Sequence, residues 1–206
     1  MKKIPLSTVN RLSLYLKCFS DFTGQDIEYA SSEDVANCIG INAAQVRKDL
    51  AYFGQFGRRG VGYHVMSLKE QISRILGTHK EWRVGIVGVG KLGSALVMHK
   101  GFQDRGFKIV AGFDIAQDKL GWEIDEVMIY DFNDVEKVIK KEKIEIIIIT
   151  TPKDALPQVM EKLKNTCIKG VLNFAGKHLM TEGDITIRNV DLGLEMEQLT
   201  YQITNK

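Results

Sequence analysis

Residues 83–93 read RVGIVGVGKLG, and this stretch decides the fold of the second half of the chain. A short apolar run meets three glycines, Gly88, Gly90 and Gly93, in the spacing G-x-G-x-x-G, and the residues SALV that follow suit a helix. In a dinucleotide-binding fold the first glycine makes a tight turn, the second lets the backbone approach the pyrophosphate, and the third lets helix and strand pack closely. The N–H groups of the helix N-terminus then face the phosphates. We therefore predict a dinucleotide site directly after a buried strand.

Two further strands extend this site. The segment FKIVAGFD, residues 107–114, ends in Asp114, which lies 26 residues after Gly88, where about 20 are expected. A carboxylate there accepts hydrogen bonds from an adenosine ribose and repels a 2′-phosphate, and no arginine directly follows it, so the sequence favours NAD over NADP. The run IEIIIIT, residues 144–150, predicts a buried parallel strand whose carboxyl end meets the ligand. The predicted contacts are Gly88, Val89, Gly90, Lys91, Leu92, Gly93, Asp114, Thr150, Thr151 and Pro152.

Strands and helices alternate through the rest of the second half, which predicts a Rossmann-type parallel sheet. Further strands are expected at 127–130, 171–174 and 185–187, and helices at 132–141 and 154–164. A last, amphipathic helix is expected over residues 194–203. It has little of its own domain left to cover. It either packs on a partner subunit or docks on its own sheet, and periodicity does not decide between the two.

The first eighty residues form a different kind of unit. A helix is predicted after Pro5, a second after the capping-box residues Ser31 and Asp34, and a third over residues 43–52 after Asn42. A glycine supplies the tight turn between the second and third helices. This order is that of a helix-turn-helix.

The third helix and the segment after it indicate contact with DNA. The side chains predicted to lie off the core face of this helix are Gln45, Arg47, Lys48 and Asp49. The next stretch, FGQFGRRGVGYHV at 53–65, has glycines that permit a tight hairpin, or wing, with two arginines at its tip. Such groups suit base edges, phosphates or a minor groove. The predicted DNA contacts are Ala44, Gln45, Arg47, Lys48, Tyr52, Arg58, Arg59, Gly60 and Tyr63.

Charge and composition agree with this division. Residues 1–80 carry 11 Lys and Arg against 7 Asp and Glu, a net charge of +4, whereas residues 81–206 have a net charge of −2. A polyanionic partner is therefore expected for the first part only. No apolar run approaches the roughly 20 residues of a membrane helix, and the N-terminus lacks a signal-peptide pattern. The three cysteines have no metal spacing, and we expect buried, reduced thiols in a cytoplasmic protein.

A winged helix joined to an NAD-type Rossmann domain resembles the Rex family of bacterial redox-sensing repressors. The resemblance covers nearly the whole chain, and the hairpin motif FGxFGRRGxGY is its most specific part. It is also carried by IPLSTVNRLSLYL at 4–16, the glycine loop, TTP at 150–152, IKGVLNFA at 168–175 and DLGLEMEQLTY at 191–201.

This resemblance implies an α/β chain with three parts. These are a winged helix-turn-helix domain at 1–80, a Rossmann-type parallel-sheet domain at 81–192 and a C-terminal helix at 193–206 that is swapped between subunits. It further implies a homodimer that NADH releases from its operator in competition with NAD⁺, without catalytic or metal-binding residues. Arg11 and Asp191 fall where the family has a pair that joins across the dimer in one redox state.

Two positions depart from the family pattern. His99 occupies a position where a tyrosine near the nicotinamide is common, so we include it among the predicted ligand contacts. Gly176 stands where a proline is usual. Both departures bear on ligand preference or on the strength of the redox response. The histidine also raises the hypothesis that the response depends on pH, which a His99→Tyr variant tests.

Three other functions are alternatives to a redox-sensing repressor. A small NAD-dependent dehydrogenase would need a substrate domain and an acid–base group, and neither is evident from the sequence or from the placement of its four histidines. A DNA-binding sensor of another nucleotide, such as a coenzyme A derivative, stays open because both departures lie at the end of the ligand opposite Asp114. An interaction module with a vestigial loop is disfavoured by the three intact glycines.

Overall fold

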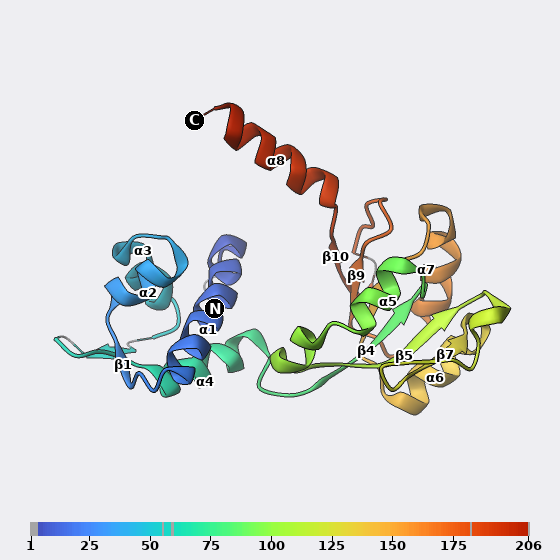
Figure 1. Ribbon diagram of the computed structural model, residues 1–206, viewed down its shortest axis with the longest axis horizontal. Helices are drawn as coiled ribbons and strands as arrows, with labels where there is room; N and C mark the ends of the chain where they lie inside the picture. Colours follow the sequence, from blue (N-terminus) through green and yellow to red (C-terminus); the bar gives the residue numbers. More distant parts are fainter. Residues whose placement is uncertain (1–3, 55, 59, 182, 206) are drawn as a thin grey trace. The chain divides into compact units, whose positions relative to one another are not determined.

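The computed structural model describes residues 4–54, 56–58, 60–181 and 183–205. The chain divides into two compact units, Met1–Lys80 and Glu81–Lys206 (Figure 1). None of the helices in the described ranges is long and apolar enough to cross a membrane. Both tryptophans of the chain, Trp82 and Trp122, belong to the second unit.

The first unit is a winged helix-turn-helix, as predicted. Its helices are α1 (Leu6–Gly24), α2 (Ser32–Ile39), α3 (Ala43–Leu50) and α4 (Val65–Leu76). Three short strands, β1 (Tyr29–Ala30), β2 (Gly57–Arg58) and β3 (Gly62–His64), form an antiparallel sheet in the order β1-β3-β2. Strands β2 and β3 are the wing that follows the helix pair.

Side-chain caps set the boundaries of the helix-turn-helix. The Ser31 hydroxyl accepts a hydrogen bond from the Asp34 N–H, and the Asp34 carboxylate accepts one from the Ser31 N–H, so the predicted capping box is present. Gly40, with φ of 72°, ends α2 in the left-handed conformation that glycine favours. The Asn42 side chain caps α3, which ends at Leu50, two residues before its predicted end.

The wing depends on glycine at one close approach. Gly62 has a φ of +98°, and a Cβ there would lie 2.5 Å from the carbonyl oxygen of Ala30. No other residue fits without moving β1 away from β3. The turn is closed by the Val61 N–H, which donates to the carbonyl oxygen of Arg58 at 3.1 Å. Arg59, predicted at the tip, lies outside the described residues.

The prediction that the cysteines are buried was right only for Cys18. Cys18 lies in the core of the first unit, where burial raises the pKa of its thiol. Cys38 and Cys167 are exposed. The buried residues of α2 are Val35 and Ala36, so Cys38 falls outside the strip that packs on the core.

The second unit is built on a seven-stranded sheet in the order β10-β9-β8-β4-β5-β7-β6. Its strands are β4 (Trp82–Val87), β5 (Phe107–Asp114), β6 (Glu123–Ile124), β7 (Val127–Asp131), β8 (Ile146–Ile149), β9 (Gly170–Asn173) and β10 (Thr186–Asn189). All neighbours are parallel except β6 and β7. Starting from β7, the six parallel strands follow the 3-2-1-4-5-6 order of a Rossmann sheet.

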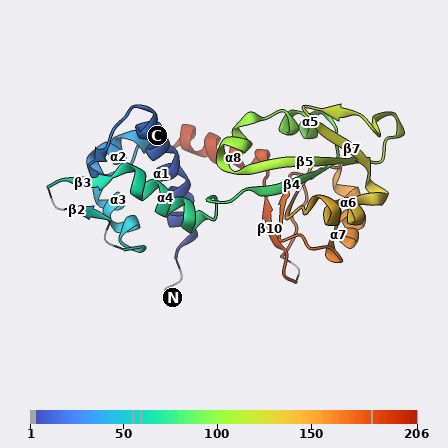
Figure 2. The ribbon, with the colours of Figure 1, turned by 90° about the horizontal axis from the view of Figure 1, so that it is seen from below.

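Helices cover this sheet on both faces (Figure 2). On one face, α6 (Val135–Glu142) and α7 (Leu156–Lys164) form the larger core cluster with the strands. On the other face, α5 (Lys91–Val97) contributes Val97 to a smaller cluster. Short 3₁₀ turns lie between these elements at Lys100–Arg105, Gln117–Lys119, Phe132–Asp134 and Lys153–Ala155.

The last helix, α8 (Leu192–Thr204), has no buried residue. The Asp191 carboxylate caps it by accepting hydrogen bonds from the Gly193 and Leu194 N–H groups. Its exposed large apolar side chains are Leu192, Leu194, Met196, Leu199, Tyr201 and Ile203. Of the two alternatives, docking on its own sheet is therefore excluded in this structure.

Candidate functional site

Each glycine of the loop after β4 has a different environment. Gly88 has a φ of +93°, and a Cβ there would lie 2.8 Å from Cγ2 of Thr151. A Cβ on Gly93 would lie 2.1 Å from the carbonyl oxygen of Gly88, so α5 can approach β4 only without a side chain. Among the described residues, apart from its two chain neighbours, no atom lies within 4 Å of a Cβ on Gly90. The turn and the close packing thus need glycine for the protein itself, whereas the space over Gly90 is left for a ligand.

The loop lies where ligands bind in open α/β sheets. Strands β4 and β8 are neighbours, and the strand order reverses between them. In open α/β sheets, ligands bind in a crevice at the carboxyl ends of the strands where the order reverses. The Thr150 hydroxyl donates to the carbonyl oxygen of Gly88 at 2.5 Å and ties the end of β8 to the glycine loop. The Thr151 Oγ1 is buried and has no hydrogen-bond partner among the described residues. Thr151 can therefore offer an unused polar atom to a ligand in this crevice.

Asp114 lies at the end of β5 beside this loop. Its carboxylate accepts hydrogen bonds from the N–H groups of Val89 at 2.9 Å and Ala116 at 3.0 Å, and from the Lys119 ammonium at 3.0 Å. Burial opposes ionisation of this group. The three hydrogen bonds outweigh that effect and lower the pKa of Asp114 below its ordinary value. Asp114 is therefore an ionised acceptor that also fixes the loop.

Lys119 is a neighbour of Asp114 that the sequence directly after the strand does not reveal. No cation follows Asp114 immediately, but a 3₁₀ turn over Gln117–Lys119 brings the lysine back to the carboxylate. The ion pair keeps one cation close to the expected position of the adenosine ribose. In the sequence, this ion pair is indicated by a lysine five residues after the end of β5.

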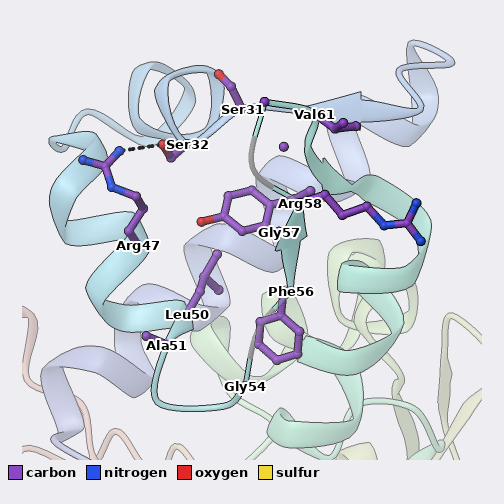
Figure 3. A pocket seen from close by; sticks show the side chains of 13 residues that line it. Ser31, Ser32, Arg47, Leu50, Ala51, Gly54, Phe56, Gly57, Arg58 and Val61 are labelled. Carbon is purple, nitrogen blue, oxygen red and sulfur yellow. Dashed lines mark hydrogen bonds between the residues drawn. The ribbon is translucent and has the colours of Figure 1, made fainter.

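A groove of about 590 Å³ lies between α3 and the wing (Figure 3). Of the predicted DNA contacts, Arg47, Arg58, Gly60 and Tyr63 line it. Arg47 comes from α3 and donates to the Ser32 hydroxyl at 2.8 Å, whereas Arg58 extends from β2 away from Arg47 (Figure 3). The groove therefore carries cations from two different elements.

The other predicted DNA contacts do not line this groove. Ala44, Lys48 and Tyr52 are exposed, and Gln45 is half-buried with its amide nitrogen hydrogen-bonded to Asp49 at 2.8 Å. All four belong to α3 or to the turn directly after it.

Comparison with known proteins decides the family. A family model described as "Putative DNA-binding protein N-terminus" matches residues 3–51, and one described as "CoA binding domain" matches residues 79–176. The chain is 38% identical to the redox-sensing transcriptional repressor Rex of Thermosipho africanus, over 98% of this chain and 97% of that protein.

This chain belongs to the Rex family.

Solved structures of RSP, a Rex-family repressor, support the same assignment. RSP in complex with β-NAD⁺ and operator DNA is 30% identical with a TM-score of 0.91, and covers all of this chain and 94% of that one. RSP in complex with β-NADH is 29% identical with a TM-score of 0.86, and covers all of this chain and 96% of that one. Rex proteins are transcriptional repressors, so this chain is not assigned to the enzymes that share the Rossmann fold.

His99 and Gly176, the two positions that the resemblance marks as departures, both lie outside the helices and strands. His99 lies beyond the end of α5, is exposed, and packs edge-to-face on Phe102 with ring centroids 5.0 Å apart. Gly176 has a φ of +66°, a conformation that the ring of a proline forbids. The loop after β9 therefore follows a path that a proline at this position would not permit.

A buried amide that the sequence did not reveal holds this loop. Asn173 is 2% exposed and donates through its amide nitrogen to the carbonyl oxygen of Lys177 and to Oδ1 of Asn189. Oδ1 of Asn189 in turn accepts a hydrogen bond from the Leu179 N–H, and its amide nitrogen donates one to the Leu179 carbonyl oxygen. In the sequence, this hydrogen-bond network is indicated only by two asparagines at the carboxyl ends of β9 and β10.

The prediction that Asp49 lies off the core face of α3 was wrong. Asp49 is 1% exposed, because Arg11 and Tyr15 of α1 donate hydrogen bonds to its carboxylate and close over it. Arg11 and Tyr15 are one turn apart on α1, which was a usable signal for a shared partner. The pairing of Arg11 with Asp191 across a Rex dimer stays a prediction.

Proposed function

We propose that this Rex-family chain is a homodimeric repressor that binds operator DNA in the bacterial cytoplasm and leaves it when NADH binds, with NAD⁺ competing. The observation that carries the proposal is the joining of a winged helix to a glycine loop with an ionised acceptor at Asp114 in one chain. The complexes recorded for RSP with NAD⁺, NADH and operator DNA support it.

The ligand would be held by groups that the site leaves available. The pyrophosphate would lie over Gly90 and the first turn of α5, and Asp114 would accept hydrogen bonds from the adenosine ribose. Thr151 would supply the unused hydroxyl. The ligand carries the redox information in its nicotinamide ring, which differs in charge and planarity between the two forms. The remaining predicted contacts are Gly88, Val89, Lys91, Leu92, Gly93, His99, Thr150 and Pro152.

DNA would be held by the first unit. The first residues of α3 would face the major groove and the wing would contact phosphates or the minor groove. Two such units at a fixed spacing are needed for two operator half-sites. NADH can release the dimer only by favouring an arrangement of the subunits in which this spacing is lost. An Arg11–Asp191 pair between subunits is the proposed contact that differs between the arrangements.

Two exposed apolar surfaces are available for dimerisation. One is α8, none of whose side chains is buried. The other is a groove of about 370 Å³ on the face of the sheet opposite α6 and α7, lined by apolar residues such as Ile146, Ile148 and Leu172. Burial of both against a second copy would remove a large apolar area from water. The segment 193–206 would then be the part exchanged between subunits.

One observation favours a second candidate ligand. The family model that matches residues 79–176 is described as a CoA binding domain. A coenzyme A derivative also presents an adenosine with a free 2′-hydroxyl, which can donate a hydrogen bond to the Asp114 carboxylate. A DNA-binding sensor of coenzyme A is therefore the alternative to test beside NADH.

The deciding experiment follows binding of the full-length protein to a palindromic operator by fluorescence anisotropy. NADH, NAD⁺ and coenzyme A are titrated separately at one salt concentration, because salt alone changes such affinities. Release by NADH and not by NAD⁺ is expected. Release by coenzyme A alone would support the alternative, and tight binding indifferent to all three would contradict redox sensing.

A pair of matched variants tests the ligand site. Asp114→Asn removes the ionised acceptor and should weaken NADH binding about 10-fold or more, since a hydrogen bond to a charged group contributes about 1.5–3 kcal/mol. Asp118→Asn makes the same charge change at an exposed neighbour and should leave the affinity unchanged. Equal affinities for the two variants would remove Asp114 from the site.

A further inference from the structure

A buried carboxylate joins α3 to α1. Asp49, near the end of α3, accepts hydrogen bonds from Thr8 at 3.3 Å, Arg11 at 2.9 Å and Tyr15 at 2.8 Å, all of them on α1. A fourth donor is the amide nitrogen of Gln45, one turn earlier on α3, at 2.8 Å. Four side chains from two helices therefore converge on one acceptor.

The charge of Asp49 decides how Gln45 is oriented. Burial opposes ionisation, but hydrogen bonds from Arg11, Tyr15 and Gln45 outweigh it and lower the pKa of Asp49. An ionised carboxylate only accepts hydrogen bonds, so the Gln45 amide turns its NH₂ group toward it. Oε1 of Gln45 therefore lies on the side of the amide away from Asp49.

Gln45 is placed where this orientation has a consequence. It is the third residue of α3, in the first turn, which in a recognition helix lies close to the base edges. An outward amide oxygen with one remaining amide hydrogen matches the N6 donor and N7 acceptor of adenine. Guanine presents two acceptors, O6 and N7, and cannot donate to that oxygen.

We propose that Asp49 is a positioning residue that fixes the Gln45 amide with its oxygen toward the operator, so that Gln45 selects adenine over guanine in the major groove. This inference rests on the proposed DNA-binding function, and it adds which base one side chain reads and what holds that side chain. Arg11 and Tyr15 act indirectly, because their hydrogen bonds hold the Asp49 carboxylate in place.

The test uses a set of operator duplexes in which each base pair of the half-site is replaced in turn by the other three. Binding of the full-length protein is followed by anisotropy at constant salt. The wild-type protein should prefer adenine at one position by about 5- to 150-fold. In Asp49→Asn the partner amide can donate as well as accept, so Gln45 is no longer held in one orientation. The preference at that position should fall to within a few-fold.

Two further variants separate positioning from general support. Gln45→Met removes the amide at similar length and should lose the same preference, and the double variant with Asp49→Asn should lose no more. Tyr15→Phe removes one donor to Asp49 but leaves the bond to Gln45. It should lower stability and keep the preference for adenine.

Retention of the full preference in Asp49→Asn or in Gln45→Met overturns the proposal, and so does an equal loss in Tyr15→Phe. If Asp49→Asn fails to fold, Gln45→Met and Tyr15→Phe decide the outcome. A wild-type protein that binds operator and unrelated DNA equally well would contradict the proposed function itself, which is a separate result.

Discussion

The carboxylate of Asp49 links the stability of the first unit to pH. Its pKa is lowered in the folded chain, so the unfolded chain binds more protons and stability rises with pH. The contribution is complete above the ordinary aspartate pKa of about 3.9 and is lost as the pH falls through the lower folded value. Asp49→Asn should therefore lower the free energy of unfolding by about 1.5–3 kcal/mol near neutral pH, and the difference from wild type should shrink below about pH 4.

Urea unfolding followed by far-UV circular dichroism at several pH values measures this difference. Asp21→Asn is the matched control, because Asp21 is exposed on the same unit. It should change stability by no more than about 0.5 kcal/mol at any pH. A penalty for Asp49→Asn that stayed constant down to the acid limit would show that its charge contributes nothing.

Single residues also mark where sequence reasoning failed. The apolar residues Val46 and Leu50 of α3 lie in the core, as helical spacing indicates. Helical spacing also predicted that Asp49 is exposed, because a pattern of apolar and polar residues assigns every carboxylate to the solvent side. It takes no account of the side chains of other elements that face that carboxylate. The donors that bury Asp49 come from residues 34 to 41 positions earlier, and a local pattern carries no information about them.

At the scale of elements, the strand–loop–helix around Gly88 makes a prediction that separates folding from binding. Gly93→Ala places a Cβ against the Gly88 carbonyl oxygen and should lower the free energy of unfolding by about 1–3 kcal/mol. Gly90→Ala meets open space, so it should cost no more than about 1 kcal/mol, mostly as a poorer helix cap. It should nevertheless weaken NADH binding, because the new methyl group occupies the space left for the ligand.

Thermal unfolding and an NADH titration of both variants check this contrast. Gly24→Ala, at a glycine of the first unit with open surroundings and no positive φ, controls for the general cost of replacing glycine. Wild-type NADH affinity in Gly90→Ala would mean that the ligand does not approach the loop there.

Elements were the best-predicted level of this chain. Strand β5 has the predicted bounds, residues 107–114, because a largely apolar run that ends at a charged residue permits few alternatives. The helix expected at 132–141 opens instead as a 3₁₀ turn, since the Asp131 carboxylate accepts the Asn133 N–H and delays the α-helix to Val135. Strand β1 was not expected, because two residues paired across the unit leave no periodic signal.

At the scale of the whole molecule, α8 should control the oligomeric state. Each leucine buried against a second copy contributes about 1.5–3 kcal/mol, so Leu199→Ser should raise the dimer dissociation constant about 10-fold or more. The fold of one chain should not suffer, because α8 has no buried residue. Sedimentation equilibrium over a concentration series measures the change.

Glu197→Gln, an exposed change on the same helix, is the control for this experiment. It should leave the dimer unchanged. If Leu199→Ser dimerised as tightly as wild type, α8 would not lie in the interface, and the sheet face would have to hold the subunits together alone.

Ligand and operator should oppose each other by one common factor. If both act on the same two arrangements of a dimer, the fold-change that saturating NADH causes in operator affinity equals the fold-change that operator DNA causes in NADH affinity. Calorimetric titration of NADH with and without operator, compared with the anisotropy data, measures both. Unequal factors at equilibrium would reject a two-arrangement scheme.

The placement of the two tryptophans has a spectroscopic consequence. Trp82 and Trp122 both belong to the ligand-binding unit, and the winged helix has none. NADH absorbs light at the wavelengths at which tryptophan emits, whereas NAD⁺ does not. The intrinsic emission of the unlabelled protein should therefore be quenched by energy transfer to bound NADH and not to bound NAD⁺. The chain thus carries its own optical reporter of the redox state of its ligand, independent of any dye on the DNA.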